Sequence, residues 1–226
     1  MAFSKKQHTD RSYDEELAEL RARLLTLGGK VESEIAESVR ALAERDSKLA
    51  EQVLNADREV NRLEIEIDER CRRLLVLRQP AASDLRFITT AMKIVTDLER
   101  IGDQAVNIAQ RALELNREPQ LKPYIDLPRM ADRAQRMVKE SLDAFVAGDT
   151  ALARQVCAAD AEVDALKEQI FRELLTYMME DPRTVSRAIR VILISRFMER
   201  VADHATNIAE MVIYLVEGKM VRHTLA

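Results

Sequence analysis

The chain has 226 residues, 33% of them charged, and a formal net charge of −4 at pH 7. Glycine, proline and aromatic residues are scarce and tryptophan is absent, which is typical of long amphipathic helices and not of β-sandwiches. The intermingled charges argue against a nucleic-acid-binding protein, which needs a concentrated basic face. We find no secretory leader and no apolar run near the ~20 residues of a membrane span, so we expect no membrane insertion.

The spacing of apolar residues predicts six helices. After a polar, aperiodic stretch at residues 1–12, which we expect to be a flexible tail, apolar residues recur every three or four positions. Helices of about 30 residues joined by short turns can only pack antiparallel. The predicted helices are residues 13–45, 47–77, 84–115, 130–147, 150–179 and 183–216.

Capping residues and prolines mark where these helices begin and end. Asp46 and Asp149 stand where an N-cap side chain is expected. Ser83 or Asp84 is the expected cap of the third helix. Residues 116–128 contain three prolines, and we expect them to link two halves of the chain because proline interrupts helices.

One segment of the third predicted helix returns in the sixth. Residues 98–109 read LERIGDQAVNIA and residues 198–209 read MERVADHATNIA. The second and fifth helices also correspond, at an offset of 103 residues. An internal repeat of this kind indicates two copies of one structural unit. The sequence therefore predicts an all-α protein of two pseudo-symmetric antiparallel three-helix bundles, 13–115 and 129–226, on either side of the linker at 116–128.

Each copy of the repeat carries acidic residues four positions apart, Glu99 and Asp103 in the first copy and Glu199 and Asp203 in the second. Four residues are about one helical turn, so each pair forms a ladder on one helix face. Stacked carboxylates repel one another. Solvent, a basic partner or a metal ion must therefore neutralise them.

Polar residues on the preceding helix of each half also cluster at the edge of its apolar stripe. They are Asp57 and Asn61 in the first half and Asp160 and Asp164 in the second. Adjacent helices of a bundle can bring two such edges together in a carboxylate-lined groove, which suits Mg, Mn or Fe ions. A single acidic pair is more often a solvated face, but the recurrence of these ladders in register favours metal binding.

Three basic or neutral residues beside the ladders have two interpretations each. Arg100 and Arg200 follow the first glutamate of each ladder and point away from the apolar stripe. A weak surface ion pair is their ordinary role, and contact with an acidic partner is the alternative. His204 lies beside Asp203, and a lone helical histidine is more often a surface residue than a metal ligand.

Four stretches of this sequence closely resemble the PhoU family of bacterial phosphate-signalling regulators. The resemblance runs from about residue 13 to residue 223. It implies a cytoplasmic, non-enzymatic negative regulator of phosphate uptake and of the phosphate-starvation response. The implied partners are the ATPase of the phosphate ABC transporter and a membrane sensor histidine kinase, and we expect a homodimer. The stretches are RQPAASDLR at 78–86, LERIGD at 98–103, EDPRT at 180–184 and MERVADHATNI at 198–208.

The resemblance also implies metal sites, because the E(D)xxxD motifs of this family hold metal ions or clusters in some members. The metal is expected to be Fe, Mn, Mg or Zn. Asn61 replaces an acid, which predicts a weaker first site, and Ala202 replaces the usual glycine, which predicts crowding in the second copy. Carried onto this chain, the motifs are Glu99/Asp103 and Glu199/Asp203, faced by Asp57/Asn61 and Asp160/Asp164.

Two other functions remain open at this point. A ferritin-like di-iron or metal-storage protein uses Glu-x-x-His motifs from two helices, and none of the three histidines here has a glutamate three residues earlier. A metal-free helical scaffold would leave the acids as surface decoration. We find no phosphate-binding loop and no Ser/His/Asp arrangement, so we expect a regulator and not an enzyme.

Overall fold

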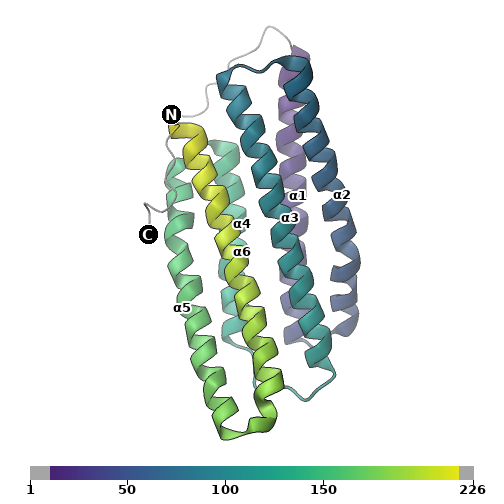
Figure 1. The fold of residues 1–226 in the computed structure, drawn as a ribbon, viewed down its shortest axis with the longest axis vertical. Coiled ribbons are helices and arrows are strands. Elements are labelled where there is room, and N and C mark those ends of the chain that lie inside the picture. The colour runs from purple at the N-terminus through teal and green to yellow at the C-terminus, as the bar shows by residue number, and fades with distance from the viewer. Residues whose placement is uncertain (1–10, 219–226) are drawn as a thin grey trace.

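The computed structural model describes residues 11–218, and over that range the chain forms six long α-helices and one short 3₁₀ helix, with no strand. The first three α-helices make one antiparallel bundle and the last three make a second bundle beside it (Figure 1). The predicted fold class is therefore confirmed. The elements are α1 (Arg11–Ala43), α2 (Ser47–Arg78), α3 (Ala82–Asn116), α4 (Asp126–Ala147), α5 (Thr150–Glu180), η1 (Pro182–Thr184) and α6 (Val185–Glu217).

The two bundles join through α3 against α6 and α1 against α4. Helices α2 and α5 lie on opposite outer sides of the molecule (Figure 1). One continuous apolar core, formed by the inward stripes of all six helices, runs through both halves, as expected when neither half can bury its stripe alone. The lines of contact between α2 and α3, and between α5 and α6, therefore lie away from the joint between the halves.

The first turns of α2 and α5 are capped in the same way. Asp46 and Asp149 each have extended backbone, and each accepts hydrogen bonds at Oδ1 from the amides two and three residues later, at 2.9 and 3.0 Å. These bonds satisfy amides that lack an intrahelical acceptor. Both predicted caps are confirmed.

Helices α1 and α3 each begin two residues earlier than the sequence suggested. Helix α1 begins at Arg11, and residues 1–10 of the expected tail lie outside the described range. Helix α3 begins at Ala82, with Ala81 at the cap position and no side-chain cap hydrogen bond. The prediction of Ser83 or Asp84 as the cap is wrong, because both already lie within the first helical turn, where the charge of Asp84 instead suits the helix dipole.

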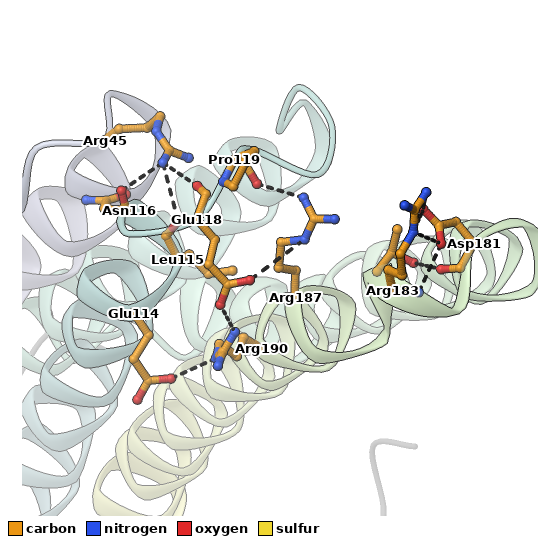
Figure 2. Close-up of polar contacts among 11 residues, drawn as sticks. Arg45, Glu114, Leu115, Asn116, Glu118, Pro119, Asp181, Arg183, Arg187 and Arg190 are labelled. Carbon is orange, nitrogen blue, oxygen red and sulfur yellow. Dashed lines mark hydrogen bonds and ion pairs between the residues drawn. The ribbon is translucent and has the colours of Figure 1, made fainter.

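The connection between the halves is shorter than expected. Helix α4 begins at Asp126, so Pro128 falls in its first turn, where the missing amide hydrogen costs nothing. From the first half, Arg45 donates to the carbonyl oxygens of Asn116 and Glu118 at 2.8 and 2.6 Å (Figure 2). The start of the connection is therefore tied to the turn between α1 and α2.

The second half holds the same connection from its other side. Arg190 on α6 donates to Glu114 and Glu118 at 3.0 and 2.7 Å, and Arg187 donates to the carbonyl oxygen of Pro119 at 2.9 Å (Figure 2). Arginine suits this role because its planar group donates in several directions at once. The segment after α3 is thus bonded to both bundles.

Candidate functional site

The acids of the first half gather where α2 packs against α3. Burial raises the pKa of Asp57, and the nearby charge of Asp103 adds to that effect. Burial, Asp103 and Glu64 likewise raise the pKa of Glu99. Carboxylates shift one another's pKa in this way only when they lie close together. We call this set the first acidic seam: Asp57, Asn61, Glu64, Glu99 and Asp103.

Asn61 binds a neighbouring carboxylate within the seam. Its Nδ2 donates to Oδ2 of Asp57, one turn earlier on α2, at 2.9 Å. The other carboxylate oxygen of Asp57, Oδ1, is buried and has no hydrogen-bond partner. Buried polar oxygens normally accept a hydrogen bond. Oδ1 of Asp57 is therefore a candidate metal-ligand atom.

A sixth residue, Glu34 on α1, reaches the first seam from the side of the core. It was not predicted from the sequence. It is only 3% exposed, and its Oε2 has no hydrogen-bond partner. A Cβ added at Gly102 would lie 3.5 Å from Glu34 Oε2 and 3.6 Å from Asp57 Oδ1, so both oxygens border the space that this glycine leaves. Burial, followed by the charge of Asp57, raises the pKa of Glu34 to about 8.

The repeat itself held the signal for Glu34. The offset of 103 residues extends to α1 and α4, because Ser38 and Ser141 are both buried and donate to the carbonyl three residues earlier, at 2.8 and 2.7 Å. At the same offset Glu34 corresponds to Met137, which is fully buried. An acid that replaces a core methionine in the other copy is a candidate functional residue.

The donor set of the first seam fits a hard cation. Glu34 and Asp57 present unpartnered buried oxygens from two helices, and burying such carboxylates is costly unless they are paired or bind a metal. No group of three or more His, Cys, Asp or Glu side chains within residues 11–218 is already arranged to hold a metal ion. Glu99 and the exposed Asp103 are the residues that would complete such a site.

The acids of the second half gather where α5 packs against α6. Burial and the charges of Asp203, Asp164 and Glu199 raise the pKa of Asp160 to about 6. Burial and the charges of Glu199 and Asp164 raise the pKa of Asp203. All four acids predicted for this half are therefore brought together. We call this set, with one lysine described next, the second acidic seam: Asp160, Asp164, Lys167, Glu199 and Asp203.

Lys167 supplies a positive charge inside the second seam. Its Nζ donates to Glu199 Oε1 on α6 at 2.7 Å and to Asp164 Oδ1 on its own helix at 3.0 Å. These bonds raise the pKa of the Lys167 ammonium, which stays charged. The corresponding residue of the first half is Glu64, at the offset of 103. Sequence reasoning missed Lys167 because it matched only the acidic positions of the two copies.

His204 makes a contact across the halves. Its Nδ1 lies 2.8 Å from Oδ1 of Asp97 on α3, and Asp97 is 8% exposed.

Arg100 and Arg200 are exposed, and within the described residues neither forms an ion pair. Surface ion pairs of these arginines with Asp103 and Asp203 therefore do not form. Within residues 11–218, no helix is long and apolar enough to cross a membrane.

Comparisons with known proteins match both halves of the chain. The family model described as the PhoU domain matches residues 24–112 and again residues 127–212. The chain is 48% identical over 217 residues to the phosphate-specific transport system accessory protein PhoU homolog of Pseudomonas putida, covering 96% of this chain and 85% of that protein. It is 36% identical to the phosphate-specific transport system accessory protein PhoU of Escherichia coli strain K12, covering 96% and 90%.

Two solved structures share the fold. The crystal structure of PhoU from Pseudomonas aeruginosa superposes with a TM-score of 0.88 at 47% identity, covering 92% of this chain and 100% of that chain. The crystal structure of the phosphate transport system regulatory protein PhoU from Streptococcus pneumoniae superposes with a TM-score of 0.86 at 32% identity, covering 92% and 99%.

Proposed function

We propose a function that proceeds from family membership: the chain belongs to the PhoU family, and we infer that it is an accessory, regulatory protein of phosphate transport. The observation that carries this proposal is the similarity itself, which covers 96% of the chain at 48% identity and includes both repeats. The finer role is negative regulation of phosphate uptake and of the phosphate-starvation response, without catalysis and from the cytoplasm.

The proposed regulator acts as an adaptor between two partners, the ATPase of the phosphate ABC transporter and the cytoplasmic part of a sensor histidine kinase. Arg100 and Arg200 support a docking role because they are exposed at equivalent positions of the two copies, and arginines without an intramolecular carboxylate are available to an acidic partner. Helices α3 and α6, which carry these arginines, lie side by side (Figure 1). We also propose that the working form is a homodimer.

We further propose that carboxylates between paired helices bind a metal ion of the Fe, Mn, Mg or Zn class. Ligand sets made only of oxygens favour the harder ions of this group. In the first seam, Glu34, Asp57, Glu99 and Asp103 would hold the ion. A bound cation supplies positive charge between α2 and α3, which removes carboxylate repulsion and holds the two helices at a constant spacing for a partner to bind.

A reporter gene under a phosphate-starvation promoter tests the regulatory role. In a Pseudomonas putida strain that lacks its own 48% identical relative, this chain is expected to switch the reporter off when phosphate is plentiful. A reporter that stays on, with the protein present at normal levels, would contradict the proposal.

The docking arginines are tested in the same strain. Arg100→Glu combined with Arg200→Glu is expected to leave the reporter on and to weaken capture of the transporter ATPase or the kinase. The matched control is Arg58→Glu with Arg73→Glu, which makes the same charge change at exposed positions of α2. Equal loss of repression by both double variants would assign the effect to net charge.

A further inference from the structure

The two acidic seams differ in the charge of one side chain, which is negative in the first seam and positive in the second. We propose that Lys167 is a built-in counter-ion that takes the place of an external cation in the second seam. Divalent cation binding is then confined to the first seam, with Glu34 as an additional buried ligand. This inference rests on the cation binding proposed above and specifies which half performs it. It reverses the expectation, drawn from Asn61 alone, that the first site is the weaker one.

Lys167 already bridges the helices that a metal ion would bridge. Its Nζ bonds to Asp164 on α5 and to Glu199 on α6, at 3.0 and 2.7 Å, and its side chain is 22% exposed. Three hydrogens of one ammonium can satisfy several carboxylate oxygens at once. A divalent cation that entered this seam would have to displace Lys167 or lie beside its positive charge.

The first seam contains no such cation. The residue at the position of Lys167 is Glu64, so the seam gains one negative charge where the other half gains a positive one. Within residues 11–218, none of the carboxylates of Glu34, Asp57, Glu64, Glu99 or Asp103 forms an ion pair. The nearby Lys30 pairs with Glu59 at 3.1 Å instead. The carboxylates of the first seam therefore have no ion-paired counter-charge among the described residues, and an external cation would supply one.

Glu34 adds a ligand that the second half lacks. Two oxygens without a hydrogen-bond partner, Oε2 of Glu34 and Oδ1 of Asp57, border the space beside Gly102. In the second half, Met137 corresponds to Glu34 and Ala202 corresponds to Gly102. Both are fully buried, so apolar groups occupy these two positions. Acidic groups from three helices converge in the first half and from two in the second. Hard divalent cations prefer the site that offers more anionic oxygens.

The test measures Mn²⁺ binding by the full chain with calorimetry, after chelator treatment and dialysis. Glu34→Gln and Asp57→Asn are each expected to weaken Mn²⁺ binding at least ~10-fold, whereas Asp160→Asn changes it by less than about 2-fold. Glu51→Gln, at an exposed position of α2, is the control for loss of one negative charge. Circular dichroism confirms that each variant is folded.

The role of Lys167 is tested by the gain of a site. Lys167→Gln is expected to add a second Mn²⁺ binding event, and Lys167→Arg, which keeps the charge, is expected to behave as wild type. The control is Arg154→Gln, because Arg154 also bridges α5 to α6, through Glu217 at 3.0 Å, but lies outside the seam. If Lys167→Gln folds and gains no site, Lys167 is not the counter-ion.

Two results would overturn the inference in distinguishable ways. Mn²⁺ binding that is lost with Asp160→Asn and unaffected by Glu34→Gln would place the site in the second seam, and the proposed cation binding would stand without this inference. A wild-type chain that binds no Mn²⁺ would overturn both the inference and the proposed cation binding, while the regulatory role would still be judged by the reporter.

Discussion

At the scale of single residues, the buried carboxyl of Glu34 makes the stability of the protein depend on pH. In the cation-free protein its pKa is raised from 4.5 to about 8 by burial and by Asp57. Between these two values the native state holds a proton that the unfolded chain has released. The free energy of unfolding therefore falls as pH rises through this window. Below about pH 4.5 both states are protonated, and above about pH 8 the full cost of the buried charge is present.

We predict that Glu34→Gln removes this pH dependence. Between pH 5 and pH 8 the cation-free wild type should lose on the order of 3 kcal/mol of unfolding free energy more than Glu34→Gln does. Urea unfolding in the presence of chelator measures the difference, with Glu51→Gln as the control. The prediction fails if wild type and Glu34→Gln lose stability in parallel over this range.

Prediction from the sequence identified Glu99 as a site residue but did not identify Glu34. The half-buried position of Glu99 followed from its place at the edge of one apolar stripe. The burial of Glu34 depends on the approach of α2 and α3 as well as on its own helix, and on the space left by Gly102. A stripe on one helix does not contain that information, because the depth of a boundary position is set by the neighbouring helices.

At the scale of helices, the two copies use different chemistry to fill equivalent space. The first copy combines Glu34 with Gly102, and the second combines Met137 with Ala202. The added methyl group of an alanine at position 102 would lie 3.3 Å from Val60 Cγ1 and 3.5 Å from Glu34 Oε2. Glycine in the middle of a helix costs up to about 1 kcal/mol relative to alanine, so the first copy keeps Gly102 at a cost in stability.

We predict that Glu34→Met combined with Gly102→Ala, which copies the second half into the first, raises the melting temperature of the cation-free protein at pH 8. The double change removes an unpaired buried acid and a helical glycine. It should also abolish Mn²⁺ binding. Thermal unfolding followed by circular dichroism measures the effect, and a lower melting temperature than that of wild type would show that position 102 has no room for a methyl group.

Helix ends were predictable where a side chain determines them. Asp46 and Asp149 each bind two free amides, so the local sequence contains the whole interaction. The start of α3 at Ala82 involves no side-chain cap, and its first turn is closed by the backbone bond from the Leu85 amide to the Ala81 carbonyl at 2.8 Å. A boundary without a capping side chain is therefore located less exactly from the sequence.

At the scale of the whole molecule, the joint between the bundles breaks the symmetry of the repeat. Asp97 on α3 binds His204 on α6 at 2.8 Å. The residues at the equivalent positions, at the offset of 100, are Phe197 and Gln104, so the pair occurs once and not twice. The sequence predicted two bundles and gave no indication of this contact, because helix periodicity does not specify how two finished bundles dock.

We predict that Asp97 and His204 are energetically coupled. In a double-mutant cycle with Asp97→Ala and His204→Ala, the coupling in the free energy of unfolding should be about 1–3 kcal/mol, because the bond is largely buried. The exposed pair of Arg62 and Glu66 on α2 is the control and should give about 0.5 kcal/mol or less. Equal coupling for the two pairs would mean that the joint does not depend on this bond.

Because Lys167 is part of the chain, the supply of positive charge to the second seam does not depend on the metal content of the cell. A group attached to the chain beside its acceptors has an effective concentration on the order of mM or more, and this value is the same in a metal-rich and a metal-starved cell. Under the cation binding proposed above, the ammonium at 2.7 Å from Glu199 would keep the second half in one state, whereas the first half would change with the cations around it. On that proposal the duplicated chain would carry its own reference copy, and a partner that contacts both halves would read the presence of the cation as a difference between them.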